Sequence, residues 1–252
     1  MIKALSRTSV DLKTTEVISS LLQILNTKKA RYNDKVETLE KEYARLIGVK
    51  EAVAFPYSRT GTYYALKALE LQEGDEVIMP AFTFWVDAAM VVMAGLKPVF
   101  VDVNFETQSI DTALIENAIT PRTKVIYPTH LNGLPADMDQ IMKIAKKHDL
   151  RVMEDCARSC GATYNDKRIG SFDIGSFSFG YGKSFYGFGG AMVTSDDAAF
   201  IKKLRDLKKD FKHISLKNIC IQTLKGSLLK YLNISYFYRF SIFPMVYKFQ
   251  VE

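Results

Sequence analysis

The chain has 252 residues, of which 48% are hydrophobic and 25% charged, so it can form one large α/β domain, or one domain and part of another. Its formal net charge of +6 suits acidic partners, which include a nucleotide-bearing substrate, an anionic membrane surface and nucleic acid, and charge alone does not choose among them. The sequence has no signal-peptide core, no apolar run that could span a bilayer and no paired-cysteine zinc pattern, so we expect a cytoplasmic protein with reduced thiols.

Seven short segments rich in β-branched and aromatic residues are predicted to be strands, and segments of helical period separate most of them. In chain order they cover residues 51–58, 75–81, 97–103, 124–130, 151–156, 174–180 and 190–195. Alternating strands and helices predict a mostly parallel sheet with helices on both faces. The last two strands are joined by a connection too short for a helix, so the sheet is expected to be mixed.

Two of the helical segments carry clear end signals. The segment KVETLEKEYARLIG ends at Gly48 and places one apolar face inward, made of Val36, Leu39, Tyr43, Leu46 and Ile47. The segment DMDQIMKIAKKHD begins at Asp137, a favourable N-cap, and its inward residues are Met138, Ile141, Ile144 and Ala145.

Lys183 lies in the stretch SFSFGYGKSFYGFGGAMV, which contains no other charged residue. A surface lysine in a glycine-rich turn is the commoner case. The alternative is chemical: aromatic and glycine neighbours easily desolvate the amine, its pKa falls, and a neutral amine attacks carbonyl groups.

Three further features follow predicted strands, at the edge where such sheets bind ligands. The pair Glu154–Asp155 is either a solvated strand end or a carboxylate that holds a proton on a heterocyclic nitrogen. The segment SRTGTYYALKAL is either an ordinary connection or a phosphate seat. Phe84 and Trp85 are either core residues or a ring that stacks on a planar cofactor. With a reactive lysine, these features are the set that holds pyridoxal phosphate.

Several motifs also occur together in a familiar order, namely GDEVIMPAFTF, KPVFVDV, TPRTKVIYPTHLNGLPADMDQI, EDCA, GSFDIGSFSF, GYGK and FGGAMVTS. Over roughly residues 30–210 the chain resembles the DegT/DnrJ/EryC1/StrS family of sugar aminotransferases, which are pyridoxal-phosphate enzymes of fold type I. The resemblance implies an aspartate-aminotransferase-like large domain with an N-terminal helical segment at residues 1–210. Residues 211–252 would be the aromatic-rich start of a smaller C-terminal domain that is largely missing.

The resemblance also implies roles for individual residues. Lys183 matches the lysine that forms a Schiff base with the cofactor and carries the proton between Cα and the cofactor's C4′. Asp155 matches the aspartate that pairs with the pyridine nitrogen. Phe84 matches the aromatic residue that stacks on the ring, with its neighbour Trp85 as the second choice.

The phosphate group has its own set of matching positions. Gly61, Thr62 and the backbone N–H of Tyr63 match the phosphate-binding turn, and Ser178 matches a serine that also reaches the phosphate.

Three positions depart from the family pattern. Arg158 stands where Gln or His usually contacts the ring hydroxyl, so the local charge differs. Phe188 stands where many members have Glu, and Gly180 replaces a frequent His. These departures leave the sugar substrate open.

The expected reaction is transamination, in which an amino acid, with glutamate as the expected donor, provides the amino group for a nucleotide-linked keto-sugar. The product would serve cell-surface polysaccharide or secondary-metabolite sugar biosynthesis. Because the family completes its site with a second subunit, we expect a homodimer; neither a metal site nor nucleic-acid binding is expected.

Two alternatives stay open. The first is a pyridoxal-phosphate-dependent sugar dehydratase, although relatives that dehydrate usually lack the lysine retained here as Lys183. The second is a non-catalytic fragment that acts as a binding partner through the aromatic, basic tail at residues 231–249. Docking of this tail on a membrane is included in this alternative but is not favoured.

Overall fold

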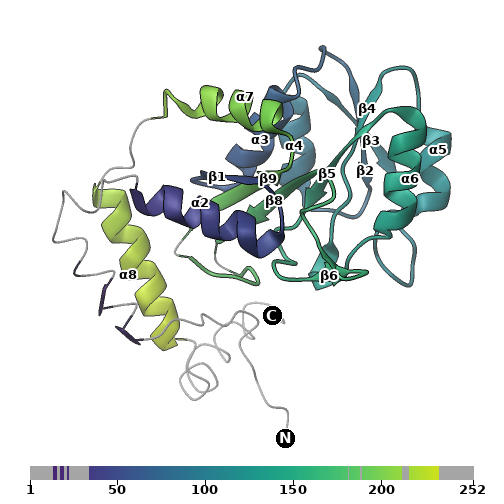
Figure 1. Ribbon diagram of the computed structural model, residues 1–252. Helices are drawn as coiled ribbons and strands as arrows, with labels where there is room; N and C mark the ends of the chain where they lie inside the picture. Colours follow the sequence, from purple (N-terminus) through teal and green to yellow (C-terminus); the bar gives the residue numbers. More distant parts are fainter. Residues whose placement is uncertain are drawn as a thin grey trace, which may run out of the picture.

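A computed structural model describes residues 34–180, 182–187, 189–211 and 216–232, together with Thr14, Thr15, Ile18, Ser19 and Leu22. Within this part of the chain, seven strands form one mixed sheet with helices on both faces (Figure 1). The prediction of an α/β fold with a mostly parallel, mixed sheet is confirmed. Phe188 and the aromatic tail beyond residue 232 lie outside the described residues.

Each strand of this sheet falls on one of the seven predicted segments. In sheet order they are β1 (Glu51–Phe55), β9 (Ala191–Ser195), β8 (Ile174–Ser178), β5 (Arg151–Asp155), β4 (Thr123–Ile126), β2 (Glu76–Pro80) and β3 (Lys97–Val101). Strand β9 is antiparallel to both β1 and β8, and the other neighbouring pairs are parallel. The carboxyl ends of β1, β2, β4, β5 and β8 therefore lie along one edge. A short hairpin of β6 (Thr163–Tyr164) and β7 (Lys167–Arg168), which the sequence did not predict, stands apart.

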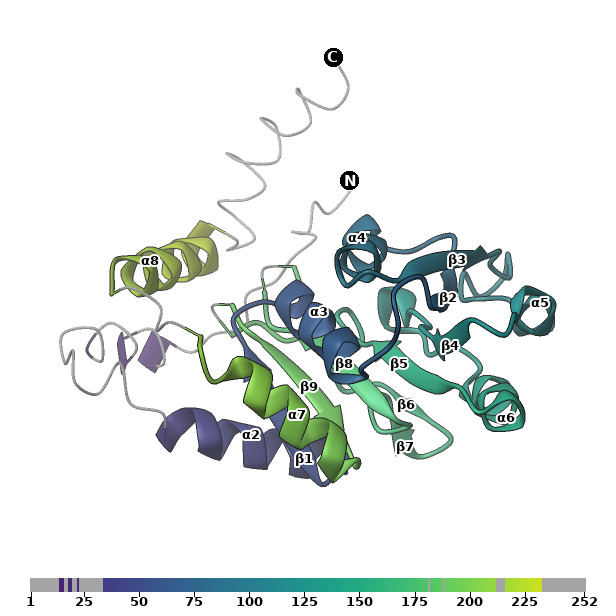
Figure 2. The same ribbon diagram turned by 90° about the horizontal axis from the view of Figure 1, so that it is seen from above.

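The two faces of the sheet are covered by different helices (Figure 2). Helices α3 (Ser58–Ala68), α4 (Trp85–Met93) and α7 (Ala198–Lys208) pack on one face, and α2 (Asp34–Ile47), α5 (Thr112–Ala118) and α6 (Met138–His148) pack on the other. Successive strand residues supply both cores, because side chains alternate between faces: Val77 of β2 lies in the first core and Ile78 in the second. No described helix, including α8 (Leu216–Leu232), is long and apolar enough to cross a membrane.

The end signals of α6 are confirmed. The Asp137 side chain caps the helix by accepting a hydrogen bond from the Gln140 N–H at 3.2 Å. The residues expected to point inward are all buried: Met138, Ile141, Ile144 and Ala145.

Helix α2 ends before Gly48, as predicted, and this glycine has a φ of +85°. The prediction of its inward face was partly wrong. Tyr43 and Ile47 are buried, whereas three other members of the predicted face are exposed, namely Val36, Leu39 and Leu46. Glu40 is buried instead, because its carboxylate accepts the Ala54 N–H at 2.7 Å and pairs with Arg205 at 2.7 Å.

Gly175 in β8 is a position where only a glycine fits. A Cβ there would lie 2.4 Å from Thr194 Oγ1 and 2.5 Å from the Cα of Gly170. Thr194 cannot move away freely because its hydroxyl donates to the Gly170 carbonyl at 2.6 Å. Gly175→Ala is therefore expected to lower the free energy of unfolding by about 3 kcal/mol in urea denaturation. Gly180→Ala, whose Cβ would lie 3.6 Å from Ser178 Oγ, is the control, and equal losses in the two variants would contradict the packing argument.

Candidate active site

The candidate residues gather at the carboxyl edge of the sheet. Asp155 is the last residue of β5 and Ser178 the last of β8, while Lys183 lies in the loop between β8 and β9. Phe84 is the N-cap of α4, the helix that follows β2. Segments that are distant in the sequence thus meet at one edge because their strands are parallel neighbours or near neighbours.

Lys183 is half-buried, and its Nζ lies 5.8 Å from the centre of the Phe84 ring. Burial lowers the pKa of this ammonium group, and the charge of Arg158 lowers it further, while the negative charges of Asp155 and Asp87 oppose the shift. The direction agrees with the expectation drawn from the glycine and aromatic neighbours. A lowered pKa increases the fraction of neutral amine, which is the nucleophilic form.

Asp155 is nearly buried, with 7% of its surface exposed, and its Oδ1 accepts the Ala157 N–H at 2.9 Å. Burial raises the pKa of this carboxyl, while the Ala157 hydrogen bond and the charge of Lys183 favour the ionised form. A buried carboxylate with a fixed hydrogen bond is suited to hold a proton on the ring nitrogen of a bound heterocycle.

Asp87 is a second carboxyl at this edge, and the sequence prediction missed it. It lies in the first turn of α4, is 7% exposed, and is near enough to Asp155 for the charge of Asp155 to raise its pKa. The signal was present, since Asp87 is the one charged residue in the apolar helix WVDAAMVVM. Tyr127 Oη donates a hydrogen bond to Asp87 Oδ1 at 3.2 Å.

Two effects act on Asp87 in opposite directions. A helix N-terminus favours the ionised form by about 0.3–1 kcal/mol. Burial raises the pKa of Asp87 well above its usual range, and the nearby Asp155 charge raises it further. Because placing a second buried charge beside a first costs several kcal/mol, burial and like charge prevail over the helix dipole.

The predicted phosphate turn begins differently from the expectation. Helix α3 starts at Ser58, and the Gly61 N–H donates to the Tyr57 carbonyl at 3.0 Å, so Gly61, Thr62 and Tyr63 already lie within the helix. The Thr62 hydroxyl is fully buried and hydrogen-bonds to Tyr127 at 3.3 Å and Ser176 at 3.2 Å. The N–H groups without a partner inside the helix are therefore those that precede Gly61, at residues 58–60.

The remaining predicted residues are Phe84, Trp85, Ser178 and Arg158. Phe84 is 54% exposed and Trp85 71%, and the Phe84 ring is the one that lies beside Lys183 Nζ. Ser178 is buried at the end of β8. Arg158 is exposed, and its backbone carbonyl accepts the Ser184 hydroxyl at 2.6 Å, which ties the loop after β5 to the loop that carries Lys183.

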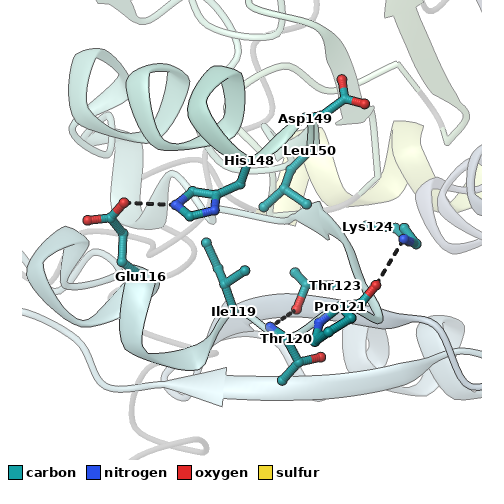
Figure 3. A pocket seen from close by; sticks show the side chains of 9 residues that line it. All are labelled: Glu116, Ile119, Thr120, Pro121, Thr123, Lys124, His148, Asp149 and Leu150. Carbon is teal, nitrogen blue, oxygen red and sulfur yellow. Dashed lines mark hydrogen bonds and ion pairs between the residues drawn. The ribbon is translucent and has the colours of Figure 1, made fainter.

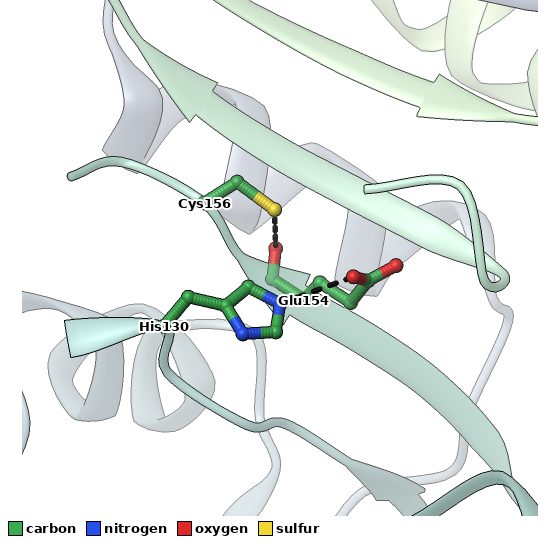
Figure 4. A group of neighbouring side chains, drawn as sticks. All are labelled: His130, Glu154 and Cys156. Carbon is green, nitrogen blue, oxygen red and sulfur yellow. Dashed lines mark hydrogen bonds and ion pairs between the residues drawn. The ribbon is translucent and has the colours of Figure 1, made fainter. Parts of the chain in front are cut away.

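His130, Glu154 and Cys156 form a fully buried cluster (Figure 4), and two of its members flank Asp155 in the sequence. The ligand atoms of the three side chains lie within 4.8 Å of one another, as in a metal site. Their hydrogen bonds indicate a structural role instead. His130 Nδ1 accepts the Ala136 N–H at 3.0 Å, so its proton is on Nε2, which donates to Glu154 Oε2 at 3.0 Å.

Glu154 also accepts the Gly170 N–H at 2.7 Å and the Phe172 N–H at 3.0 Å. Both of its oxygens therefore face donors, and the amide of Glu154→Gln would place an N–H₂ group against one of them. We expect this variant to lose about 3 kcal/mol of unfolding free energy. Glu73→Gln, on an exposed surface, is the control; a Glu154→Gln midpoint in urea that matches the control would contradict this role.

A separate hollow of about 510 Å³ lies where α5 and α6 end and β4 begins (Figure 3). Its lining includes the ion pair between Glu116 and His148, whose atoms are 2.9 Å apart. The residues that line it precede β4 and β5 or are the first two residues of β4, so the hollow lies at the amino edge of the sheet, opposite the edge that carries Asp155 and Lys183.

Comparisons with known proteins agree with this arrangement. The model of the DegT/DnrJ/EryC1/StrS aminotransferase family matches residues 12–219. The chain is 46% identical over 195 residues to UDP-N-acetyl-3-dehydro-alpha-D-glucosamine 3-aminotransferase of Acidithiobacillus ferrooxidans, covering 77% of this chain and 53% of that protein. It is 42% identical over 170 residues to GDP-perosamine synthase of Caulobacter vibrioides, covering 67% of this chain and 46% of that protein.

Among solved structures, NtdA from Bacillus subtilis with bound cofactor PMP superimposes with a TM-score of 0.74 at 29% identity, over 93% of this chain and 57% of the other. The chain spans about half the length of the curated relatives that it matches. Because the family model covers most of the chain, the chain belongs to the DegT/DnrJ/EryC1/StrS aminotransferase family, whose members depend on pyridoxal phosphate.

Proposed function

We propose that the protein transfers an amino group from an amino acid to a nucleotide-linked keto-sugar, with pyridoxal phosphate as its cofactor. The observation that carries this proposal is the meeting of Lys183 and Asp155 at one edge of the sheet, close enough for the charge of each to shift the pKa of the other. A reactive amine and a buried carboxylate are the two groups that the chemistry needs from the protein.

The residues present fit this cofactor. Lys183 is half-buried with a lowered pKa, Asp155 is a buried carboxyl at the end of β5, and the Phe84 ring lies beside the lysine. The N-terminus of α3 and the hydroxyl of Ser178, both at the carboxyl edge, are suited to the phosphate dianion. When bound, pyridoxal phosphate supplies an electrophilic carbon for amines and an electron sink for the charge left when an amino acid loses its Cα proton.

Each of these side chains has a defined task. Lys183 Nζ, in its neutral form, would hold the cofactor through its carbonyl carbon, and as a free amine it would carry the proton between the amino acid's Cα and the cofactor's C4′. Asp155 would use its negative charge to hold a proton on the ring nitrogen. Phe84 contributes a flat apolar surface that excludes water from one side of the site. The positive charge of Arg158 helps to keep the Lys183 pKa low.

The substrate class is proposed from the relatives. Two of them are named for UDP- and GDP-linked sugars, and the net charge of +6 suits a substrate that carries a diphosphate. We propose glutamate as the amino donor and a role in cell-surface polysaccharide or secondary-metabolite sugar synthesis in the cytoplasm. Arg158 and Gly180 are the described positions at which the substrate preference would differ from that of other members.

We also propose that the active unit is a homodimer. Several aromatic side chains near the carboxyl edge are exposed, namely Tyr57, Phe82, Trp85 and Phe185. Large apolar side chains that are exposed near a site are typical of a surface that a partner covers.

The test is the first half of the reaction, followed by absorbance. The protein is loaded with pyridoxal phosphate and mixed with glutamate. We expect the absorbance to show that the bound cofactor is converted to its amine form. A nucleotide-linked keto-sugar should then restore the starting spectrum and yield an amino sugar by mass spectrometry. Failure of every amino acid to convert the cofactor would overturn the proposal, and a deoxy-sugar product would favour the dehydratase.

A further inference from the structure

We propose that Asp87 is a positioning residue that stays neutral and donates a hydrogen bond to Asp155, so that Asp155 is the ionised carboxylate presented to the cofactor's ring nitrogen. This inference rests on the proposed binding of pyridoxal phosphate. The inference adds Asp87 of α4 to the site, a residue that lies outside the motifs by which the family resemblance was identified.

The first support is the placement of the two carboxyls. Asp87 and Asp155 are each 7% exposed and come from different elements that meet beside the end of β4. Tyr127 Oη donates to Asp87 Oδ1 at 3.2 Å, and the carbonyl of the next residue, Pro128, accepts the Asp155 N–H at 2.9 Å. Two ionised carboxylates have only acceptor atoms, so a hydrogen bond between them requires one proton. With one shared proton, Asp87 can donate to Asp155, and the pair then carries one negative charge.

The second support is a chain of buried hydroxyl groups that ends at Asp87. Tyr127 Oη donates to Asp87 Oδ1 at 3.2 Å, which uses its one proton. The contact between Tyr127 and Thr62, at 3.3 Å, then has Thr62 as donor, and the contact between Thr62 and Ser176, at 3.2 Å, has Ser176 as donor. All donors along the chain point toward Asp87, and the proton of Asp87 is left to point toward Asp155.

The third support is the set of groups that face the pair. Asp87 is faced by the hydroxyl of Tyr127, by the positive charge of Lys183 and by the negative charge of Asp155. Asp155 is faced by Lys183, by His130 and by the Ala157 N–H. Asp155 is thus nearer to a fixed N–H donor, and Asp87 is nearer to a hydroxyl of low acidity, so the charge is better stabilised on Asp155.

The consequence concerns where the proton of the ring nitrogen is held. A carboxylate that accepts hydrogen bonds from both Asp87 and Ala157 has a lower proton affinity than one that accepts neither. The proton shared with the ring nitrogen then stays on the nitrogen, as the proposed chemistry requires. Asp87 acts through Asp155 and does not need to touch the cofactor.

The test compares Asp87→Asn with Asp87→Leu. Asparagine keeps an acceptor for Tyr127 and a neutral donor for Asp155, whereas leucine of similar size keeps neither. Each protein is loaded with pyridoxal phosphate labelled with ¹⁵N in the ring, and the ¹⁵N chemical shift reports whether the nitrogen is protonated. We expect the protonated signal in the wild type and in Asp87→Asn, and its loss or reduction in Asp87→Leu.

Turnover should follow the same order, with a loss of about ten- to a hundredfold in Asp87→Leu and partial recovery in Asp87→Asn. If Asp87→Asn loses the protonated signal as Asp87→Leu does, Asp87 acts as a charge and the proposal is overturned. A ring nitrogen that is fully protonated in Asp87→Leu also overturns the proposal, because Asp155 then holds the proton there without a hydrogen bond from Asp87.

A second measurement needs no cofactor and no leucine variant. The infrared difference between the wild-type apoprotein and Asp87→Asn at neutral pH should contain the carbonyl band of a neutral carboxyl group that the variant lacks. Absence of that band overturns the neutral assignment even where Asp87→Leu fails to fold. If the wild type binds no pyridoxal phosphate, the proposed function fails, and the infrared result still decides the protonation of the pair.

Discussion

Lys183→Ala is expected to reduce amino-group transfer by about 10³- to 10⁴-fold, because one amine is assigned both the nucleophilic step and the proton transfer that follows. Steady-state rates with glutamate and a nucleotide-linked keto-sugar measure the loss. Lys183 is half-buried in a loop outside helices and strands, so its removal takes away no helix or strand hydrogen bond. The melting temperature of the variant should therefore stay close to that of the wild type.

The matched control is Lys143→Ala, which removes an exposed lysine from α6, a helix on the same face of the sheet as α5. It should keep the wild-type rate. A Lys183→Ala protein that folds and retains more than about a tenth of the wild-type rate would contradict the role given to this amine. Added small amines offer a further check, since they should restore part of the proton transfer in Lys183→Ala and leave the control unaffected.

Asp155→Asn is expected to lower turnover by about 10²- to 10³-fold, since the variant loses the charge that keeps the ring nitrogen protonated. The amide oxygen of asparagine can still accept the Ala157 N–H, which is 2.9 Å from Oδ1 in the wild type. The geometry of the strand end is thus retained while the charge is removed. Cofactor binding should weaken much less than turnover, because the phosphate and ring contacts come from other residues.

Asp166→Asn, an exposed carboxylate in the turn between β6 and β7, is the control for the same chemical change. Because the amide oxygen of Asp155→Asn can still accept the Ala157 N–H, the melting temperature of this variant should stay close to that of the control. If its rate equals that of the control, the ring nitrogen is held by some other group, and the assignment of Asp155 is wrong.

Local sequence patterns predicted the elements of this fold well. All seven strands of the sheet were predicted from short β-branched and aromatic runs, and the reversed direction of β9 follows from the short connection after β8. The order of the strands was not predicted, because pairing between distant segments leaves no local pattern. The inward face of α2 was partly mispredicted for the same reason: Glu40 is buried by contacts with Ala54 and Arg205, which are remote in the sequence.

In the candidate site, too, local patterns revealed some residues and missed those whose role depends on distant segments. Lys183 and Asp155 stood out because their residue types are unusual in their local surroundings, and the structure brings them together. Asp87 carried a similar signal, as the charged residue of an apolar helix, yet its meaning depends on Tyr127 and Asp155. The start of α3 was misjudged because glycine and threonine at residues 61–62 suggested a turn, whereas the helix already includes them.

Reductive trapping of the cofactor tests the central claim most directly. The purified chain is mixed with pyridoxal phosphate, reduced with borohydride and digested, and the modified peptide is identified by mass spectrometry. We predict one modified site, Lys183, and none in the Lys183→Ala protein. Modification spread over exposed lysines such as Lys143, or no modification at all, would contradict the claim that this edge of the sheet holds the cofactor.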